Sequence, residues 1–265
     1  MKKLRFGLPD KPDTGDTFLI TPLFKNSDNF ILELTDSVRG REIAEIFKGM
    51  VEIEFVKEIK PETYYFETFG VNKGSPFIHA CKRYLEIFNL KTDDCIPYIK
   101  LTEEDKQFAK DFLKDYKSPI TISPIAGGYE NENDTFAEKK MLRAEEWDFI
   151  TEKLSANHDI IFFSKSGARS NNFNIKHTTK IFDMDIRKMC SIFNYCKFHL
   201  GIENGLLHAA LASGSKTLCF VEGFGWNTGW LFTNYGYTEN IWKNESCRAF
   251  YQLKSEFKSF DKFIL

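Results

Sequence analysis

Short apolar segments alternate with segments of helical periodicity along the chain, and this alternation limits the fold more than any other feature of the sequence. It is typical of α/β proteins, because parallel strands are joined by crossover connections that are usually helices. The expected strands are Leu4–Leu8, Phe30–Leu34, Val51–Val56, Pro119–Pro124, Ile160–Ser164, Phe198–Ile202 and Thr217–Phe220. The expected helices begin near Thr17 and then cover Val38–Lys48, Pro76–Phe88, Glu103–Asp115, Ala144–Leu154, Ile186–Tyr195 and Leu206–Ala212.

The segment Asp115–Pro119 breaks this pattern, since it is polar and contains a proline directly after a long helix. We expect a hinge here between two α/β lobes, residues 1–117 and 118–248, with residues 249–265 packing back across both. Ligands of parallel sheets bind at the carboxyl ends of the strands, so a cleft between the lobes is the expected site. The run Gly127–Asp134 is too polar to pack and is predicted to be a mobile loop over that cleft.

The composition narrows the classes of function. With 36 Lys and Arg against 38 Asp and Glu in 265 residues, the chain lacks the overall basic field of most nucleic-acid-binding proteins. The six cysteines form no CxxC pair, which predicts reduced thiols in the cytosol. No apolar run approaches the roughly 18 residues of a membrane span. We therefore expect a cytoplasmic protein, either free or peripheral at the inner membrane.

The stretch Gly201–Gly214 joins a short apolar strand to a helix of small residues through a turn that contains Glu203, Asn204 and Gly205. Such a turn directs unpaired backbone N–H groups and the positive end of the helix dipole at one point, and a phosphate fits there. The alternative is an ordinary strand–turn–helix corner with His208 in the core. The sequence alone leaves both interpretations open.

Three separated motifs point to one family. In Gly15–Pro22, a Gly-Asp pair leads a helix that ends in Thr-Pro. Lys140 is followed by a tryptophan seven positions later. The segment Gly201–Ala212 is similar to a turn of the form Asp-Ser/Thr-Gly-x-x-His-x-Ala-Ala. In this order and spacing the chain resembles the heptosyltransferase-like glycosyltransferases of family 9, over most of residues 4–225.

The resemblance implies a GT-B fold, in which two Rossmann-like lobes with parallel sheets face a central cleft. It implies that residues 1–117 bind the acceptor and residues 118–248 the nucleotide sugar, with no metal or other cofactor. Asp16 would be the general base, and Lys140 would hold the donor phosphate. The implied lining of the donor site is Glu203, Asn204, Gly205, Leu206 and His208.

The sequence also departs from the family pattern. Glu203 stands where an aspartate is usual, Asn204 stands where a hydroxyl residue is usual, and the first loop is longer and acidic. Asp13 in that loop is therefore a substitute candidate for the base. Further candidates for the site are Thr17, Gly127 and Asp185.

Each candidate has a structural alternative. Asp16 or Glu203 could be a helix N-cap, a position that acidic and amide side chains favour. Lys140 could belong to a solvated charge run, and His208 could be a buried structural histidine. The run Asp183-Met184-Asp185 has the spacing by which other glycosyltransferases hold a divalent cation, although Asp185 more simply caps the following helix.

We expect a metal-independent inverting glycosyltransferase that moves a hexosyl, heptosyl or pentosyl unit from a nucleoside-diphosphate sugar to a hydroxyl acceptor. The expected acceptor is a bacterial surface saccharide such as lipopolysaccharide core or capsule. The alternatives are a sugar-nucleotide epimerase, a non-catalytic nucleotide-sugar-binding module, and a phage-type transferase that modifies a nucleic-acid base. That last activity requires a basic groove, for which the candidates are Lys2, Lys3, Arg5, Arg39, Arg41, Lys82 and Arg83.

Overall fold

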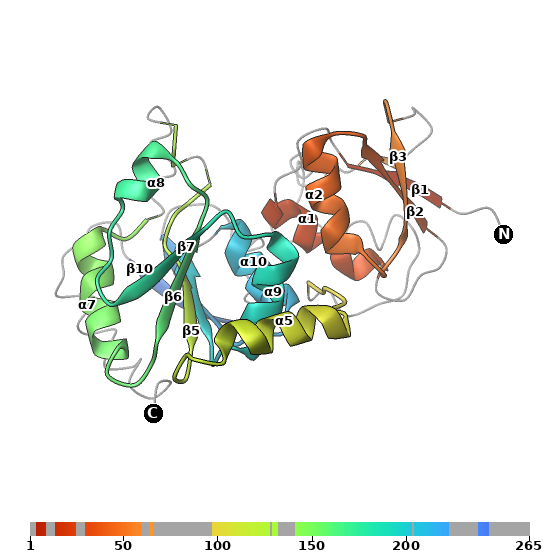
Figure 1. The fold of residues 1–265 in the computed structure, drawn as a ribbon. Coiled ribbons are helices and arrows are strands. Elements are labelled where there is room, and N and C mark those ends of the chain that lie inside the picture. The colour runs from red at the N-terminus through yellow and green to blue at the C-terminus, as the bar shows by residue number, and fades with distance from the viewer. Residues whose placement is uncertain are drawn as a thin grey trace.

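The computed structural model of the chain describes residues 4–8, 14–24, 30–59, 64–65, 97–127, 129–131, 141–202, 204–222 and 238–243. For Asp16, Leu19 and residues 64–65, 221–222 and 238–243 it describes only the course of the backbone. Within these ranges the strands form two parallel sheets, one in each of two lobes, as Figure 1 shows. The α/β architecture expected from the sequence is confirmed.

The first lobe is built on a sheet with the strand order β3-β2-β1-β4. Its strands are β1 (Leu4–Gly7), β2 (Phe30–Thr35), β3 (Glu52–Val56) and β4 (Tyr64–Tyr65). Its helices are α1 (Thr14–Leu19), the short 3-10 helix η1 (Thr21–Phe24) and α2 (Val38–Phe47). Phe24 lies in the core of this lobe, where its ring meets those of Phe6, Phe30 and Phe47 edge to face.

The second lobe is built on a sheet with the strand order β10-β9-β8-β5-β6-β7. Its strands are β5 (Ile120–Ser123), β6 (Ile160–Ser164), β7 (Thr178–Phe182), β8 (His199–Ile202), β9 (Thr217–Glu222) and β10 (Thr238–Lys243). Its helices are α7 (Ala144–Leu154), α8 (Ala168–Asn172), α9 (Ile186–Tyr195) and α10 (Gly205–Ala212). Because all the strand pairs are parallel, the carboxyl ends of the strands lie along one edge of the sheet.

Different helices cover the two faces of this second sheet (Figure 1). Along β6, Ile160 and Phe162 belong to the core on the α7 side, whereas Ile161 and Phe163 belong to the core on the α9 and α10 side. The core on the α9 and α10 side also contains the buried side chains of the first lobe, from Phe6 onward. The two lobes therefore share one hydrophobic core.

Helix α5 (Glu103–Leu113) comes before the second sheet in the chain but packs on α9, as Figure 1 shows. Thr102 starts α5 through a capping box with Asp105. Phe112 stacks on Phe108 and on Tyr116, with ring centroids 6.1 and 5.7 Å apart. The lobe boundary after residue 117 stays a prediction, and the helix that precedes it packs on the second lobe.

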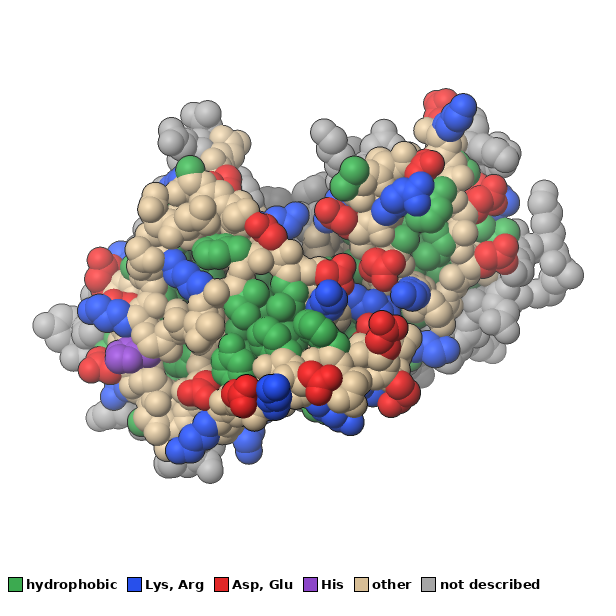
Figure 2. Space-filling model, in the orientation of Figure 1, with side chains coloured by type: hydrophobic (Ala, Val, Ile, Leu, Met, Phe, Trp, Pro, Cys, Tyr) green, Lys and Arg blue, Asp and Glu red, His purple; other side chains and the backbone are tan. Residues whose placement is uncertain are grey.

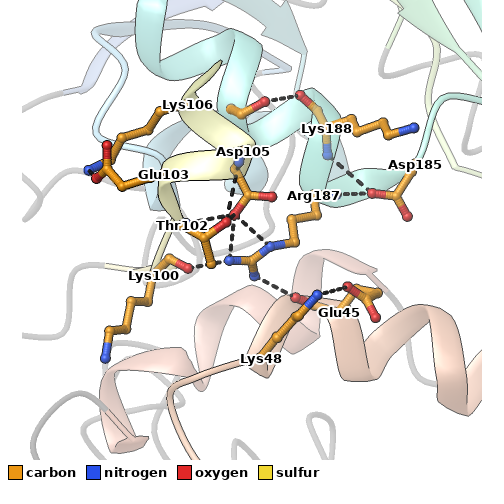
Figure 3. A network of polar contacts seen from close by, with 11 residues as sticks. Glu45, Lys48, Lys100, Thr102, Glu103, Asp105, Lys106, Asp185, Arg187 and Lys188 are labelled. Carbon is orange, nitrogen blue, oxygen red and sulfur yellow. Dashed lines mark hydrogen bonds and ion pairs between the residues drawn. The ribbon is translucent and has the colours of Figure 1, made fainter. Parts of the chain in front are cut away.

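Arg187 joins the two lobes (Figure 3). It lies in the first turn of α9 and is only 3% exposed. Its guanidinium contacts Asp105 Oδ2 through Nε at 2.8 Å and through Nη2 at 2.7 Å. It also donates to the Glu45 carbonyl at 2.9 Å and to the Lys100 carbonyl at 2.5 Å. The Glu45 carbonyl lies in the last turn of α2, where backbone acceptors have no partner within the helix, so Arg187 caps a helix of the first lobe from the second.

Most of the expected elements are present, and Ala144–Leu154, Ile160–Ser164 and Ile186–Tyr195 have the expected bounds. Helix α1 begins at Thr14, earlier than the expected start near Thr17. The elements that the sequence did not predict are η1, β4, α8, β7 and β10. The expected helix 76–88 and the segment 249–265 lie outside the described residues.

Candidate functional site

Among the described strands, each sheet has one point where the chain order reverses, and ligands of parallel sheets bind at such points. In the first sheet β2 and β3 lie on one side of β1 and β4 lies on the other, so the reversal lies between β1 and β4. In the second sheet the reversal lies between β5 and β8. Helix α1 follows β1 and helix α10 follows β8, so each helix starts beside a reversal point.

The starts of α1 and α10 meet between the lobes. A Cβ atom on Gly205 would lie 3.1 Å from Thr14 Cβ and 3.2 Å from Gly15 N, which is tighter than an ordinary contact. The glycine at 205 therefore allows the first turns of the two helices to approach each other. Two motifs far apart in the sequence, one in each lobe, are neighbours in the structure.

Asn204 is the N-cap of α10, and its side chain is fully engaged. Its Oδ1 accepts a hydrogen bond from the Leu207 N–H at 2.9 Å. Its Nδ2 donates to the carbonyls of Ser123 at 3.1 Å and Ile125 at 3.0 Å. Asn204 therefore shapes the corner rather than offering its side chain to a ligand. Because the cap is Asn204, the alternative in which Glu203 caps this helix is wrong.

The groups that α10 can offer to an anion are the backbone N–H groups of Gly205 and Leu206. As the first two residues of the helix they have no acceptor within it, and both residues are half-buried. The helix dipole places positive potential at the same point. His208, one turn further on, is 4% exposed, and this burial favours the structural interpretation of that residue.

In the first lobe, Asp16 is the third residue of α1. The alternative in which Asp16 is the N-cap is therefore wrong, because an N-cap precedes the helix. Thr17 is 1% exposed and belongs to the interior. Arg39, at the start of α2, donates from Nη2 to Thr14 Oγ1 at 2.7 Å, so a guanidinium lies at the beginning of α1.

Three of the candidates, Asp13, Lys140 and Glu203, lie outside the described residues, and their roles stay predictions. Gly127 is exposed, and a Cβ atom there would meet nothing within 4 Å.

Asp185 caps α9, accepting hydrogen bonds from the N–H groups of Arg187 at 2.9 Å and Lys188 at 3.1 Å. Asp183 accepts from the Ser166 N–H at 2.9 Å. Both carboxylates of the Asp183-Met184-Asp185 run thus accept hydrogen bonds from backbone N–H groups. The interpretation of Asp185 as a helix cap is confirmed. Among the described residues, no three His, Cys, Asp or Glu side chains are grouped so that they could hold a metal ion.

The expectation that the run Gly127–Asp134 is too polar to pack is wrong for Tyr129, which packs against the core on the α7 side. Glu130 is exposed but is tied to α8 by hydrogen bonds. The Glu130 carboxylate accepts hydrogen bonds from the hydroxyl of Ser170 and from the N–H groups of Ser170 at 2.7 Å and Arg169 at 3.0 Å. These bonds, that of the Ser170 hydroxyl first, hold the pKa of Glu130 below its usual range. The Arg169 guanidinium lies 4.2 Å from the centroid of the Tyr129 ring. A polar segment can pack when another element supplies partners for it.

Three candidates for a basic groove, Arg5, Arg39 and Arg41, are described, and each is neutralised by neighbouring carboxylates. The other candidates, Lys2, Lys3, Lys82 and Arg83, lie outside the described residues. Arg5 pairs with Glu33 and Glu54, Arg39 with Glu42, and Arg41 with Asp36. Figure 2 accordingly shows acidic and basic side chains interspersed on the visible face. The described part of the first lobe presents no groove of unbalanced positive charge.

No protein-family model matches the chain, and no curated protein matches its sequence. Solved structures do match. The E. coli ADP-heptose LPS heptosyltransferase II is 10% identical, with 100% of this chain and 98% of that chain covered and a TM-score of 0.68. The E. coli heptosyltransferase WaaC with ADP is 11% identical, with 99% and 100% covered and a TM-score of 0.64. A family 9 glycosyl transferase from Veillonella parvula is 12% identical, with 97% and 90% covered and a TM-score of 0.65.

The chain has the fold of the family 9 glycosyltransferases. This confirms the GT-B fold that the three sequence motifs imply. The reversal points at which α1 and α10 begin are those of the two Rossmann-like halves of a GT-B protein.

Sequence reasoning missed a polar cluster beside the second reversal point, formed by Thr121 and Ser123 of β5 and His199 of β8. A signal for it existed. In the apolar strand Ile120–Ser123, polar residues occupy alternate positions and so share one face. Their partner on the adjacent strand was not predictable from local pattern, because it lies far along the chain.

Proposed function

We propose that the chain is a glycosyltransferase that moves a sugar from a nucleoside-diphosphate sugar to a hydroxyl acceptor. The observation that carries the proposal is the meeting of α1 and α10 at the two reversal points of a GT-B fold. A donor phosphate at α10 and a base at α1 would then lie beside each other. The structural neighbours support the choice of donor, since WaaC was solved with ADP and with ADP-2-deoxy-2-fluoro heptose.

The proposed chemistry follows from the charges that change during transfer. As the bond from the sugar to the diphosphate breaks, negative charge grows on the diphosphate. The N–H groups of Gly205 and Leu206, the dipole of α10 and the Lys140 ammonium would stabilise that charge. Glu203 would bind sugar or ribose hydroxyls.

Asp16 would accept the proton of the acceptor hydroxyl as its oxygen attacks the sugar carbon. Attack from the face opposite the leaving diphosphate inverts the configuration at that carbon. No step of this scheme requires a metal ion, and independence from metal is part of the proposal.

The proposed acceptor is a saccharide of the bacterial surface, such as lipopolysaccharide core, presented at the inner membrane. The proposed encounter with the membrane is peripheral. No described helix is long and apolar enough to cross a membrane. A nucleic-acid acceptor is less well supported, because Arg5, Arg39 and Arg41 are each paired with carboxylates.

The first test is a thermal-shift screen with ADP, UDP, GDP and CDP. A ligand that binds only the folded chain raises Tm by mass action. We expect at least one of the four to raise it, and no shift with any of them at millimolar concentration would contradict the proposal.

The second test is Asp16→Asn, assayed with the donor that binds and with saccharide acceptors. The amide keeps the shape of the side chain but cannot take a proton, so transfer should fall about 10²–10⁴-fold with unchanged donor affinity. Transfer at the wild-type rate, where chemistry limits turnover, would remove Asp16 as the base and direct attention to Asp13.

A further inference from the structure

A buried polar cluster spans β5 and β8 on the sheet face that α9 and α10 cover. Thr121 Oγ1 lies 2.9 Å from His199 Nδ1, and Ser123 Oγ lies 2.9 Å from His199 Nε2. None of the three residues is more than 1% exposed. The Phe193 ring of α9 packs on the imidazole, with ring centroids 4.9 Å apart.

Burial keeps the His199 ring neutral, because it lowers the pKa of this histidine to about 3. A neutral imidazole donates one hydrogen bond and accepts one. A hydroxyl on each side therefore satisfies both ring nitrogens and holds the ring in one orientation.

The cluster continues into the corner that starts α10. The Ser123 hydroxyl lies 3.4 Å from Asn204 Oδ1, the oxygen that caps the Leu207 N–H. The Asn204 amide in turn donates to the Ser123 and Ile125 carbonyls. One set of hydrogen bonds thus joins the end of β5, the end of β8 and the first turn of α10.

Gly201 makes room for this arrangement. A Cβ atom there would overlap Ser123 Oγ and would lie 3.2 Å from His199 Nε2. The polar cluster therefore explains why the family-like turn begins with a glycine.

The position of the cluster argues for more than packing. The neighbouring residues Ile120, Ile122, Leu200 and Ile202, on the other face of the same strands, are apolar. Buried polar groups cost free energy unless they are paired. Apolar residues on this face, as on the other face of the same strands, would avoid that cost. The polar residues lie beside the reversal point, and their hydrogen bonds end at the cap that sets where the Gly205 and Leu206 N–H groups point.

We propose that His199 and Ser123 are positioning residues that hold the N-terminal turn of α10 in the geometry that binds the diphosphate of the donor. This inference rests on the proposed function for its ligand. It adds that affinity for the diphosphate depends on two buried side chains that do not touch it.

The test compares Ser123→Ala with Thr121→Val. Each variant removes one buried hydroxyl of β5 that contacts His199, but only Ser123 also contacts Asn204. We expect Ser123→Ala to raise the Kd of ADP, or of whichever diphosphate binds, about fivefold by calorimetry, the size of one lost hydrogen bond. Thr121→Val should leave that Kd within about twofold, because the contacts from His199 Nε2 to Ser123 and from Ser123 to Asn204 remain. The Tm should fall in both variants, since each loses a buried hydrogen bond.

A second measurement does not depend on any ligand. Hydrogen exchange at the Leu207 amide, which Asn204 caps, should be about fivefold faster in Ser123→Ala and unchanged in Thr121→Val. Equal effects of the two variants on this amide would overturn the inference. If the wild type binds no nucleoside diphosphate, the proposed function fails, and the exchange measurement still decides whether the cluster positions the turn.

A second pair of variants, at His199, covers the case in which Ser123→Ala does not fold. The amide of His199→Gln can replace Nε2 toward Ser123, whereas His199→Phe offers no polar atom. His199→Gln should restore diphosphate affinity and a donor KM close to the wild-type values, while His199→Phe raises both Kd and KM about fivefold with little change in kcat. The same loss in both variants would contradict the inference.

Discussion

Replacing Arg187 by methionine should be among the most destabilising single changes in this protein. The guanidinium is buried and holds one carboxylate and two main-chain carbonyls from two segments, helix α2 and the stretch Lys100–Asp105 (Figure 3). Methionine fills a similar volume but donates no hydrogen bond. The Asp105 carboxylate would keep its bonds to Thr102, whereas the carbonyls of Glu45 and Lys100 would lose their bonds to the guanidinium.

The magnitude follows from these losses. Removing one partner of a buried ion pair typically costs about 3–5 kcal/mol. A buried acceptor left without a partner costs about 1–3 kcal/mol, and these costs overlap because the same side chain supplies every bond. We expect Arg187→Met to lower the free energy of unfolding by about 4 kcal/mol. At about 2–4 °C for each kcal/mol in a chain of this size, Tm should fall by about 10 °C.

The measurement is urea unfolding at pH 7, with Lys188→Met as the control. Lys188 is the next residue of α9, carries the same charge and is exposed, so its replacement should change the free energy of unfolding by less than about 1 kcal/mol. Equal destabilisation by the two variants, or a loss under about 1 kcal/mol in Arg187→Met, would refute the reasoning.

The pH dependence of the free energy of unfolding provides an independent check. Burial acts to raise the pKa of Asp105, but the hydrogen bonds from Arg187 and Thr102 outweigh it and hold that pKa below its usual range. A carboxyl with a lowered pKa stabilises the fold above its unfolded value of about 4, and this contribution is lost as the pH falls through the folded pKa. The difference in stability between wild type and Arg187→Met should therefore narrow below about pH 4.

Four further outcomes are expected. Lys140→Ala should weaken donor binding by about 1.5–3 kcal/mol, measured by calorimetry, and unchanged affinity would remove Lys140 from the site. Transfer should persist after dialysis against EDTA, and its loss followed by recovery with one divalent cation would contradict a metal-independent reaction. Gly201→Ala should lower Tm by several degrees, because its Cβ would overlap Ser123 Oγ; a Tm equal to that of wild type would show that the cluster can rearrange. The thiol of Cys190, whose pKa burial raises to about 12, should react with a disulfide reagent only as the protein unfolds, and rapid labelling at pH 8 would show that the core opens.

The sequence allowed the fold class to be predicted because its signal is local. The helices Ala144–Leu154 and Ile186–Tyr195 each bury a face of helical periodicity, and Ile160–Ser164 is a continuous apolar run that is buried on both faces. Each of the three was predicted with its observed bounds. Strand β7 was missed because it is an edge strand of mixed Thr, Lys and apolar residues with no clear alternation. Helix α8 was missed because its five residues are too few to show a period.

The site was predictable only in part. Local motifs predicted a corner at the start of α10, and the structure places that corner against α1. No local pattern could show that the Asn204 side chain donates hydrogen bonds to the carbonyls of Ser123 and Ile125. Nor could it show that His199 is hydrogen-bonded to two hydroxyls on another strand. Those contacts depend on the register between β5 and β8, which only the folded chain determines.

The core that both lobes share has a consequence for how such a protein can change during evolution. Its buried side chains come from β1, α1 and β2 on one side and from β6, α9 and α10 on the other. A chimera that took one lobe from a distant relative would bring together side chains selected against different neighbours, and neither half could shield its apolar surface alone. New acceptors should therefore arise through substitutions in the loops at the carboxyl ends of the strands, where sequence can vary without disturbing the shared interior.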